Sequence, residues 1–254
     1  MGIVSKVANS RNIILEISNN YEWDISKVPI LSKHEIEMIY NLENSKNSVF
    51  SSFGISAGCS FKLTHKHIPS HNLVVLYYNM PDGNISGVKV NKSLIDKILN
   101  LYRQDVDTTA LDVDDSLLIL INEPIKNTIM NINNSINILL QQSYDQPSDT
   151  IIKEMKESKY NVSNEYFRYV TIMDINSYQV NLLKHELVPQ HYPIRDKVEI
   201  EEILKNNNAT KNELPKIDKN DPIAKIIRLV PGNICKITRY TSTGGDSIYY
   251  RICK

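Results

Sequence analysis

The stretch that decides the fold of the C-terminal part of the chain is Asp221–Arg239, which reads DPIAKIIRLVPGNICKITR. An aspartate followed by a proline is typical of a helix N-cap with proline at the first helical position, so we expect a short helix over Ile223–Ile227. Pro231 and Gly232 indicate a turn after this helix. The pattern that follows predicts a strand over Ile234–Arg239.

The residues on both sides of this stretch complete a small α+β module. A second strand is expected over Ser247–Cys253, joined to the first through Thr241–Gly245, whose two glycines permit the positive φ of a hairpin turn. Upstream, Asp196 with Glu199 three residues later is typical of a helix start. The C-terminal residues therefore predict a separate domain with its own caps, turns and hairpin.

Residues 1–180 alternate helical and strand patterns, which predicts an α/β domain with a mixed sheet. Leu117–Ile121 is wholly apolar, as expected of a central strand buried on both faces. Apolar residues at intervals of three or four from Ile125 to Leu140 predict an amphipathic helix. Further elements are expected as helices over 3–18 and after the capping pairs Ser32/Glu35 and Ser93/Asp96, as strands over 60–64, 73–78 and 166–173, and as a turn over 80–84.

A polar stretch, Gln141–Asn164, interrupts this pattern. It contains Pro147, many charges and few large apolar residues, so little of it can be expected to enter a core. We interpret it as an insertion that forms a loop or a short mobile helix.

The charge balance limits what the chain can bind by itself. Lys and Arg number 29 and Asp and Glu also number 29, so the net charge is zero. From Leu183 onward the chain has 13 basic and 9 acidic residues, which makes this part mildly basic. Proteins that bind nucleic acid without a partner protein usually carry an excess of basic residues, because neutralisation of the phosphates supplies most of the affinity. A protein that docks on a larger partner fits this balance better.

Several residue clusters suggest chemistry but have simpler interpretations. His65, His67 and His71 lack an adjacent cysteine or carboxylate, so we expect a solvated loop rather than a zinc site. The acidic residues between 105 and 115 lack the glycine of a calcium-binding loop and are expected to be solvated. Asp82 lacks the acidic-x-Lys partner of a nuclease site. The acidic residues are Asp105, Asp107, Asp112, Asp114 and Asp115.

The three cysteines, Cys59, Cys235 and Cys253, have no metal-ligand spacing and predict free thiols in a reducing compartment. No apolar run approaches the roughly 18 residues of a membrane span. The N-terminal MGIVSK has no apolar core of a signal peptide, so secretion is not expected.

Four separate motifs carry a resemblance to a known family. They are HELVPQH (His185–His191), ELPKI (Glu213–Ile217), the stretch Asp221–Arg239 and the terminal GGDSIYYRICK. In order and spacing they resemble the assembly domain of the fifth-largest subunit of eukaryotic DNA-directed RNA polymerases and of its archaeal counterpart. The high content of Asn, Ile and Lys suits an AT-rich genome, for example that of a large DNA virus.

The resemblance implies a non-catalytic polymerase subunit with a jaw domain over 1–180 and an assembly domain over 183–254. Its partners would be the largest subunit and other polymerase subunits, with downstream DNA reached through the complex, and neither cofactor nor metal is implied. The location would be the nucleus, or the virion and host cytoplasm for a viral protein. A free-standing transcription regulator or nucleic-acid-binding factor that carries the same module is the alternative.

The family motifs also imply which residues dock on the partner. In HELVPQH the two histidines are six positions apart with a proline between them, so they cannot form the paired ligands of a His-Glu-x-x-His zinc helix. We therefore expect docking and structural roles, and no catalytic ones. The residues are His185, Leu187, Val188, Pro189, His191, Leu214, Pro215, Asp221, Pro222, Lys225, Gly232, Arg239, Tyr250 and Arg251.

Overall fold

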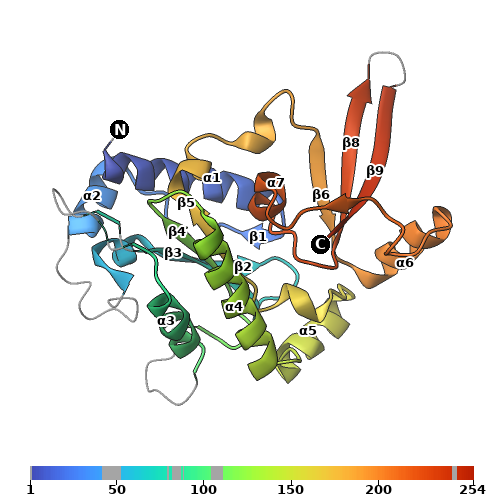
Figure 1. Ribbon diagram of the computed structural model, residues 1–254, viewed down its shortest axis with the longest axis horizontal. Helices are drawn as coiled ribbons and strands as arrows, with labels where there is room; N and C mark the ends of the chain where they lie inside the picture. Colours follow the sequence, from blue (N-terminus) through green and yellow to red (C-terminus); the bar gives the residue numbers. More distant parts are fainter. Residues whose placement is uncertain are drawn as a thin grey trace. The chain divides into compact units, whose positions relative to one another are not determined.

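The structure, a computed structural model, describes residues 2–41, 53–78, 80–81, 87, 89–103, 111–241 and 245–254. The chain forms two compact units, each built from helices and a sheet, so the expected α/β class is confirmed (Figure 1). Unit 1 comprises Met1–Glu154 and Phe167–Val180, and unit 2 comprises Met155–Tyr166 and Asn181–Lys254. Among the described residues, no helix is long and apolar enough to cross a membrane.

A five-stranded sheet in the order β1-β2-β3-β4-β5 forms the centre of unit 1. β1, β2 and β3 pair antiparallel, whereas β3, β4 and β5 pair parallel, so the sheet is mixed as predicted. β3 and β4 are buried along their whole lengths, which explains their unbroken apolar sequences. The strands are β1 (Trp23–Asp24), β2 (Phe61–His65), β3 (Asn72–Tyr77), β4 (Ser116–Ile121) and β5 (Val170–Asp174).

Helices cover both faces of this sheet. α3 and α4 bury residues such as Ile98 and Ile136 in one cluster with β3, β4 and β5. α1 contacts the opposite face, where the hydroxyl groups of Ser10 and Tyr77 are 3.0 Å apart. The helices are α1 (Ile3–Asn20), α2 (Lys33–Asn41), α3 (Ser93–Leu101), α4 (Asn127–Ser143) and α5 (Asp149–Ser158), with 3₁₀ turns at Ile55–Cys59 and Ile175–Tyr178.

The two predicted capping pairs of unit 1 have different outcomes. Ser32 and Glu35 form the expected capping box, in which Glu35 Oε2 accepts from the Ser32 amide at 2.7 Å. Ser93 is not the cap of α3. Asn91 Oδ1 accepts from the Ser93 amide at 2.9 Å, so the preceding asparagine orders the first turn of α3 instead.

The polar stretch Gln141–Asn164 departs from the expected insertion. Its first residues complete α4, and α5 follows with Ile151 fully buried. Val162 is also fully buried. Ile151 and Met155 lie four positions apart, and this spacing gives the ten-residue α5 one apolar side despite its polar composition. The stretch therefore contributes to the packed interior of the chain.

Two of the three clustered histidines are not solvated, whereas His67 is exposed in the loop between β2 and β3, as expected. His65 ends β2, His71 directly precedes β3, and both side chains are buried. His71 Nδ1 lies 2.8 Å from the carbonyl oxygen of Asp114. His71 also packs edge-on against the ring of Phe167, with the ring centroids 4.7 Å apart. The expectation of solvation was wrong for His65 and His71 because both border β3, which is buried on both faces.

The acidic stretch is also partly buried, contrary to expectation. Asp114 and Arg168 form an ion pair at 2.7 Å, and each side chain is only 5% exposed. Asp115 accepts from the amide side chain of Asn72 at 2.7 Å and lies 3.2 Å from Lys62 Nζ. The predicted solvation of Asp105 and Asp107, the Asp82 interpretation, and most of the turns at 80–84 and 241–245 fall outside the described residues.

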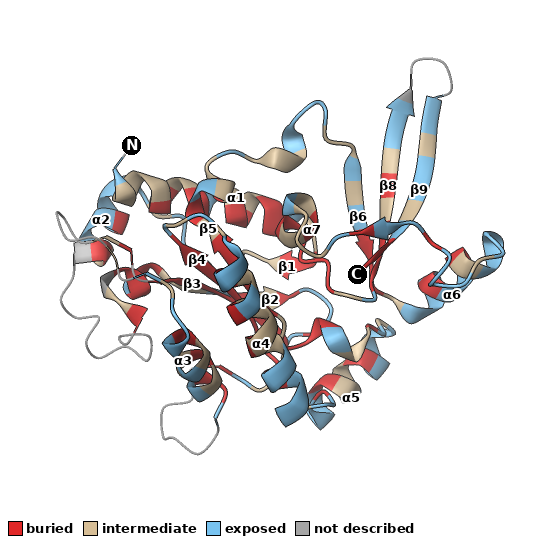
Figure 2. Cartoon of the chain, viewed as in Figure 1, coloured by how far each residue is buried: buried red, intermediate tan, exposed pale blue. Residues whose placement is uncertain are grey.

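A four-stranded sheet in the order β6-β8-β9-β7 forms unit 2. β6, β8 and β9 pair antiparallel, and β7 pairs parallel to the end of β9. α6 packs on one face through Ile200 and Ile203. Buried and exposed residues alternate along α6 (Figure 2). The elements are β6 (Gln190–Ile194), α6 (Lys197–Asn206), β7 (Lys216–Ile217), α7 (Pro222–Ile226), β8 (Ile234–Thr241) and β9 (Gly245–Cys253), with 3₁₀ turns at Asn164–Tyr166 and Leu182–Lys184.

The start and turn signals of unit 2 are confirmed. Asp196 accepts from the amides of Val198 and Glu199 and caps α6, and Asp221 caps α7 in the same way. Gly232 has φ +88°, the conformation that the predicted turn requires.

All three cysteines are buried free thiols. Burial raises the pKa of Cys59 to about 11, that of Cys235 to about 12 and that of Cys253 to about 11.

Candidate docking groove

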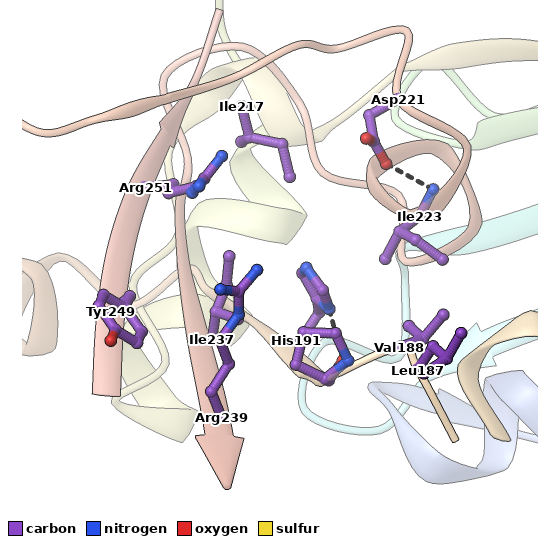
Figure 3. Close-up of a pocket in the computed structure, with 11 residues that line it drawn as sticks. Leu187, Val188, His191, Ile217, Asp221, Ile223, Ile237, Arg239, Tyr249 and Arg251 are labelled. Carbon is purple, nitrogen blue, oxygen red and sulfur yellow. Dashed lines mark hydrogen bonds between the residues drawn. The ribbon is translucent and has the colours of Figure 1, made fainter. Parts of the chain in front are cut away.

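A groove with a volume of about 320 Å³ lies in unit 2 (Figure 3). It is on the face of the sheet opposite α6, because its lining residues on β9 alternate with those that pack against α6. Most of its lining residues are apolar or aromatic, and two arginines, one histidine and one aspartate lie among them. We call it the docking groove, and its lining consists of Leu187, Val188, Pro189, His191, Ile217, Asp221, Ile223, Ile237, Arg239, Tyr249 and Arg251.

Strand register brings the floor of the docking groove together. His191 on β6 is opposite Ile237 on β8, which is in turn opposite Tyr249 on β9. Because side chains alternate between the two faces of a strand, these three point to the same side. Arg239 and Arg251 are two positions along their strands from Ile237 and Tyr249, so they share this face.

A tight turn before β6 forms one wall. The Val188 amide donates to the carbonyl oxygen of His185 at 2.9 Å, and the Leu187 amide donates to His185 Nδ1 at 3.2 Å. His191 Nδ1 lies 2.7 Å from the Pro189 carbonyl oxygen and fixes the entry into β6. Leu187 is 84% exposed at the end of this wall, although it is a large apolar residue.

The N-terminus of α7 forms the opposite wall. Asp221 Oδ1 accepts from the Ile223 amide at 2.8 Å and from the Ala224 amide at 3.3 Å. These hydrogen bonds hold the carboxylate against the helix and direct the side chain of Ile223 into the groove (Figure 3).

The arginines give the groove its chemical preference. Arg251 Nη1 reaches the Lys216 carbonyl oxygen at 3.5 Å and remains exposed. In the part of the chain that the structure describes, the Arg239 side chain forms no hydrogen bond or ion pair. Guanidinium groups bind carboxylates through paired hydrogen bonds, so this surface suits a partner with both apolar and acidic side chains.

Seven of the fourteen residues singled out from the sequence lie in the docking groove, and the other seven do not. The groove members are Leu187, Val188, Pro189, His191, Asp221, Arg239 and Arg251.

The other seven residues shape the domain around the groove. His185 orders the turn, Leu214 packs in the core beside α6, and the Pro215 carbonyl oxygen accepts from the Ile252 amide. The remaining positions are Pro222 at the start of α7, Lys225 on α7, where burial lowers its pKa, Gly232 in its turn, and Tyr250, which packs toward α6 on the opposite face.

Four lining residues were missed by the sequence reasoning: Ile217, Ile223, Ile237 and Tyr249. One of them, Tyr249, carried a usable signal. In a strand that contains Arg251, position 249 points to the same face and position 250 to the other. Tyr249 rather than Tyr250 was therefore the tyrosine to select for this face.

Comparisons with known proteins match the part of the chain that contains this groove. Residues 180–253 match the family described as RNA polymerase Rpb5, C-terminal domain. DNA-directed RNA polymerase subunit Rpo5 of Archaeoglobus fulgidus is 49% identical over 71 residues, which cover 28% of this chain and 92% of the relative. This chain belongs to the Rpb5 family.

Other members of the Rpb5 family match over the same part of the chain. Subunit Rpo5 of Methanococcoides burtonii is 39% identical over 71 residues, 28% of this chain and 90% of the relative. The Aeropyrum pernix subunit is 41% identical over 70 residues, 28% of this chain and 77% of the relative. The shared Rpb5 region thus coincides with the main segment of unit 2, which carries the docking groove.

Proposed function

We propose that this chain is a non-catalytic subunit of a multisubunit DNA-directed RNA polymerase and that residues 183–254 dock it on the largest subunit. The observation that carries the proposal is the Rpb5 match over residues 180–253. The docking groove lies within this region and combines exposed apolar groups with two arginines. Such a mixture is typical of an interface core bordered by charged residues.

We further propose that unit 1 serves as the jaw domain and lies near downstream DNA in the assembled enzyme. The zero net charge supports a position held by protein contacts rather than by independent binding of phosphates. The isolated chain should then bind duplex DNA only in the range of about 10⁻⁴–10⁻⁶ M at physiological salt. Titration of labelled duplex at several salt concentrations measures this affinity, and a salt-resistant nanomolar complex would favour a free-standing regulator.

Affinity purification from the native source tests the main proposal. The tagged chain should recover the large polymerase subunits in stoichiometric amounts under mild salt. A matched variant carrying Arg239→Glu and Arg251→Glu should recover less of them, because both substitutions reverse the charge of the docking groove without altering a buried residue. Recovery of the unmodified chain without any polymerase subunit would contradict the proposal.

A further inference from the structure

The sheet of unit 2 has an open edge along most of β9. β9 pairs with β8 from Gly245 to Ile252, but on its other side it pairs with β7 only at Ile252 and Cys253. Figure 1 shows the β8–β9 hairpin projecting beyond the rest of this sheet. Among the described residues, no strand pairs with the outer side of β9 before Ile252.

The backbone groups on this edge can be assigned from the hydrogen bonds at its end. The Ile252 amide donates to the Pro215 carbonyl oxygen at 2.8 Å, so the backbone groups of Ile252 point away from β8. Successive residues of a strand point their backbone groups to alternate sides. Asp246, Ile248 and Tyr250 therefore also direct their N–H and C=O groups outward.

This edge has few of the features that normally protect one. Protected edges are very short, carry proline or charged side chains, contain bulges, or are covered by another segment. β9 carries one charged residue near each end, Asp246 and Arg251, and no proline. The outer edge of β6, on the far side of the same sheet, contains Pro193. β9 instead presents Ile248, which is 51% exposed, and Tyr249, which is 50% exposed. An edge of this length and composition is suited to pairing with another strand.

The two faces beside the edge differ in chemistry. A strand added here would place every second side chain next to Tyr249 and Arg251, with Arg239 one strand further across the sheet. The alternate side chains would lie on the other face, next to Ile248 and Tyr250. Carboxylates match the first face and apolar groups match the second.

We propose that the outer edge of β9 binds an extended segment of a partner polypeptide, in which acidic residues alternate with apolar ones. This inference deepens the proposed function and rests on it for the identity of the partner. The added strand takes its affinity from backbone hydrogen bonds to Ile248 and Tyr250, and its specificity comes from the arginines of the docking groove.

A second copy of this chain is a less suitable occupant. Pairing two β9 edges would gather Arg239 and Arg251 from both copies on adjacent parts of the joined sheet, and like charges in this arrangement repel. The oligomeric state of the purified chain, measured by light scattering, provides the check. A dimer that is lost in Ile248→Pro would replace the proposed partner segment with a second copy.

The sharpest test compares Ile248→Pro with Ile248→Ala. Proline at 248 removes an outward N–H but no hydrogen bond between β8 and β9, whereas alanine removes the side chain and keeps the N–H. Circular dichroism and urea unfolding establish that both variants fold. In purification from the native source, Ile248→Pro should recover polymerase subunits on the order of tenfold less than Ile248→Ala, as expected for loss of a backbone pairing.

Amide hydrogen exchange provides a measurement that does not depend on the polymerase. The probe is a capped octapeptide of alternating valine and glutamate, and the control peptide has lysine in place of glutamate. The glutamate peptide should slow exchange at Ile248 and Tyr250 and leave Tyr249, already bonded to β8, unchanged.

Equal recovery by Ile248→Pro and Ile248→Ala overturns strand addition and leaves the proposed function intact. If the unmodified chain recovers no polymerase subunit, the proposed function fails, and unchanged exchange with both peptides then overturns strand addition as well.

Discussion

Arg168 organises the interior of unit 1 from an unusual backbone conformation. Its φ is +59°, two residues before the start of β5, and its side chain pairs with Asp114. The same guanidinium donates to the carbonyl oxygens of Tyr144 and Gln146 at 2.8 and 2.9 Å. Burial lowers the pKa of Arg168, and the carboxylate of Asp114 opposes this effect. One side chain thus connects the start of β4, the segment after α4 and the start of β5.

Replacing Arg168 with methionine should strongly destabilise unit 1. The substitution leaves Asp114 as a buried carboxylate without its ion-pair partner, a change that typically costs about 3–5 kcal/mol. Urea unfolding followed by circular dichroism measures the loss. Arg239→Met, at an exposed position, is the matched control and should change the free energy of unfolding by less than about 0.5 kcal/mol. Equal stability of the two variants would contradict the role assigned to Arg168.

Asp115 should make the stability depend on pH in the acidic range. Burial raises its pKa, although the hydrogen bond from Asn72 and the charge of Lys62 act in the opposite direction. The folded state therefore holds this proton more tightly than the unfolded state, whose pKa is near 3.8. The contribution of Asp115 to stability is complete below that value and is lost as the pH rises through the raised folded pKa.

Urea unfolding at a series of pH values between about 3 and 7 tests this sign. The difference in unfolding free energy between the unmodified chain and Asp115→Asn should shift in favour of the unmodified chain as the pH falls. A difference that stays constant, or moves the other way, would contradict a raised pKa.

Local pattern determined which residues could be predicted and which could not. The N-cap roles of Asp196 and Asp221 are encoded within three or four positions, so the sequence alone identifies them. Asp114 and Arg168 are 54 positions apart, and no local pattern marks either as the partner of the other. The acidic surroundings of Asp114 instead suggested solvation, and only the packed sheet brings Asp114 and Arg168 together.

Among the elements, α5 and the segment before it show how composition can mislead. The stretch was interpreted as an insertion because charges and amides dominate it, yet Arg168 and Asp114 hold the backbone between α4 and α5. Asp114 Oδ2 accepts from the Ser148 amide at 3.1 Å. β3, β4 and α4 were predictable because each carries an apolar pattern over its whole length.

Deleting Gln141–Thr150 should therefore unfold or severely weaken unit 1. The deletion removes the carbonyl acceptors of Arg168 and the amide donor to Asp114, and it leaves both buried charges short of hydrogen bonds. Thermal and urea unfolding measure the effect. The double variant Gln141→Ala/Gln142→Ala, at two exposed positions of α4, should behave like the unmodified chain. A stable deletion variant would restore the interpretation of a dispensable insertion.

The two capped helices of unit 2 separate stability from docking. Asp221→Ala and Asp196→Ala each remove an N-cap and should each cost about 0.5–2 kcal/mol. Only Asp221 lines the docking groove. Recovery of polymerase subunits should fall for Asp221→Ala and remain close to normal for Asp196→Ala. If both variants recover less polymerase in proportion to their loss of stability, Asp221 affects docking only through folding.

For the molecule as a whole, the main segment of unit 2 should fold without unit 1. It has its own core around Ile194, Ile234 and Ile252, and its Rpo5 relatives are not much longer than the matched region. The fragment 181–254 lacks the segment Met155–Tyr166 of unit 2. It therefore loses the contact between the Arg195 guanidinium and the ring of Tyr166, whose centroid lies 4.1 Å away. The fragment should thus unfold cooperatively but at a lower urea concentration than the same residues in the full chain.

The full-length variant Tyr166→Leu separates this contact from the rest of unit 2. Its unit 2 should lose about 0.5–2 kcal/mol, the range for a partly desolvated cation–π contact. Intrinsic fluorescence and circular dichroism can follow the transitions. A fragment without any cooperative transition would show that 181–254 depends on the rest of the chain for its fold.

The buried cysteines allow the opening of each unit to be measured by thiol labelling. Thiolates, not thiols, react with disulfide reagents, and the raised pKa values of Cys59, Cys235 and Cys253 leave almost no thiolate at neutral pH in the folded state. Labelling must therefore wait until the surrounding structure opens. Cys59 belongs to unit 1, whereas Cys235 and Cys253 belong to unit 2. The rate at which each thiol reacts with a disulfide reagent therefore reports how often the structure around it opens by local unfolding, and no engineered probe is needed.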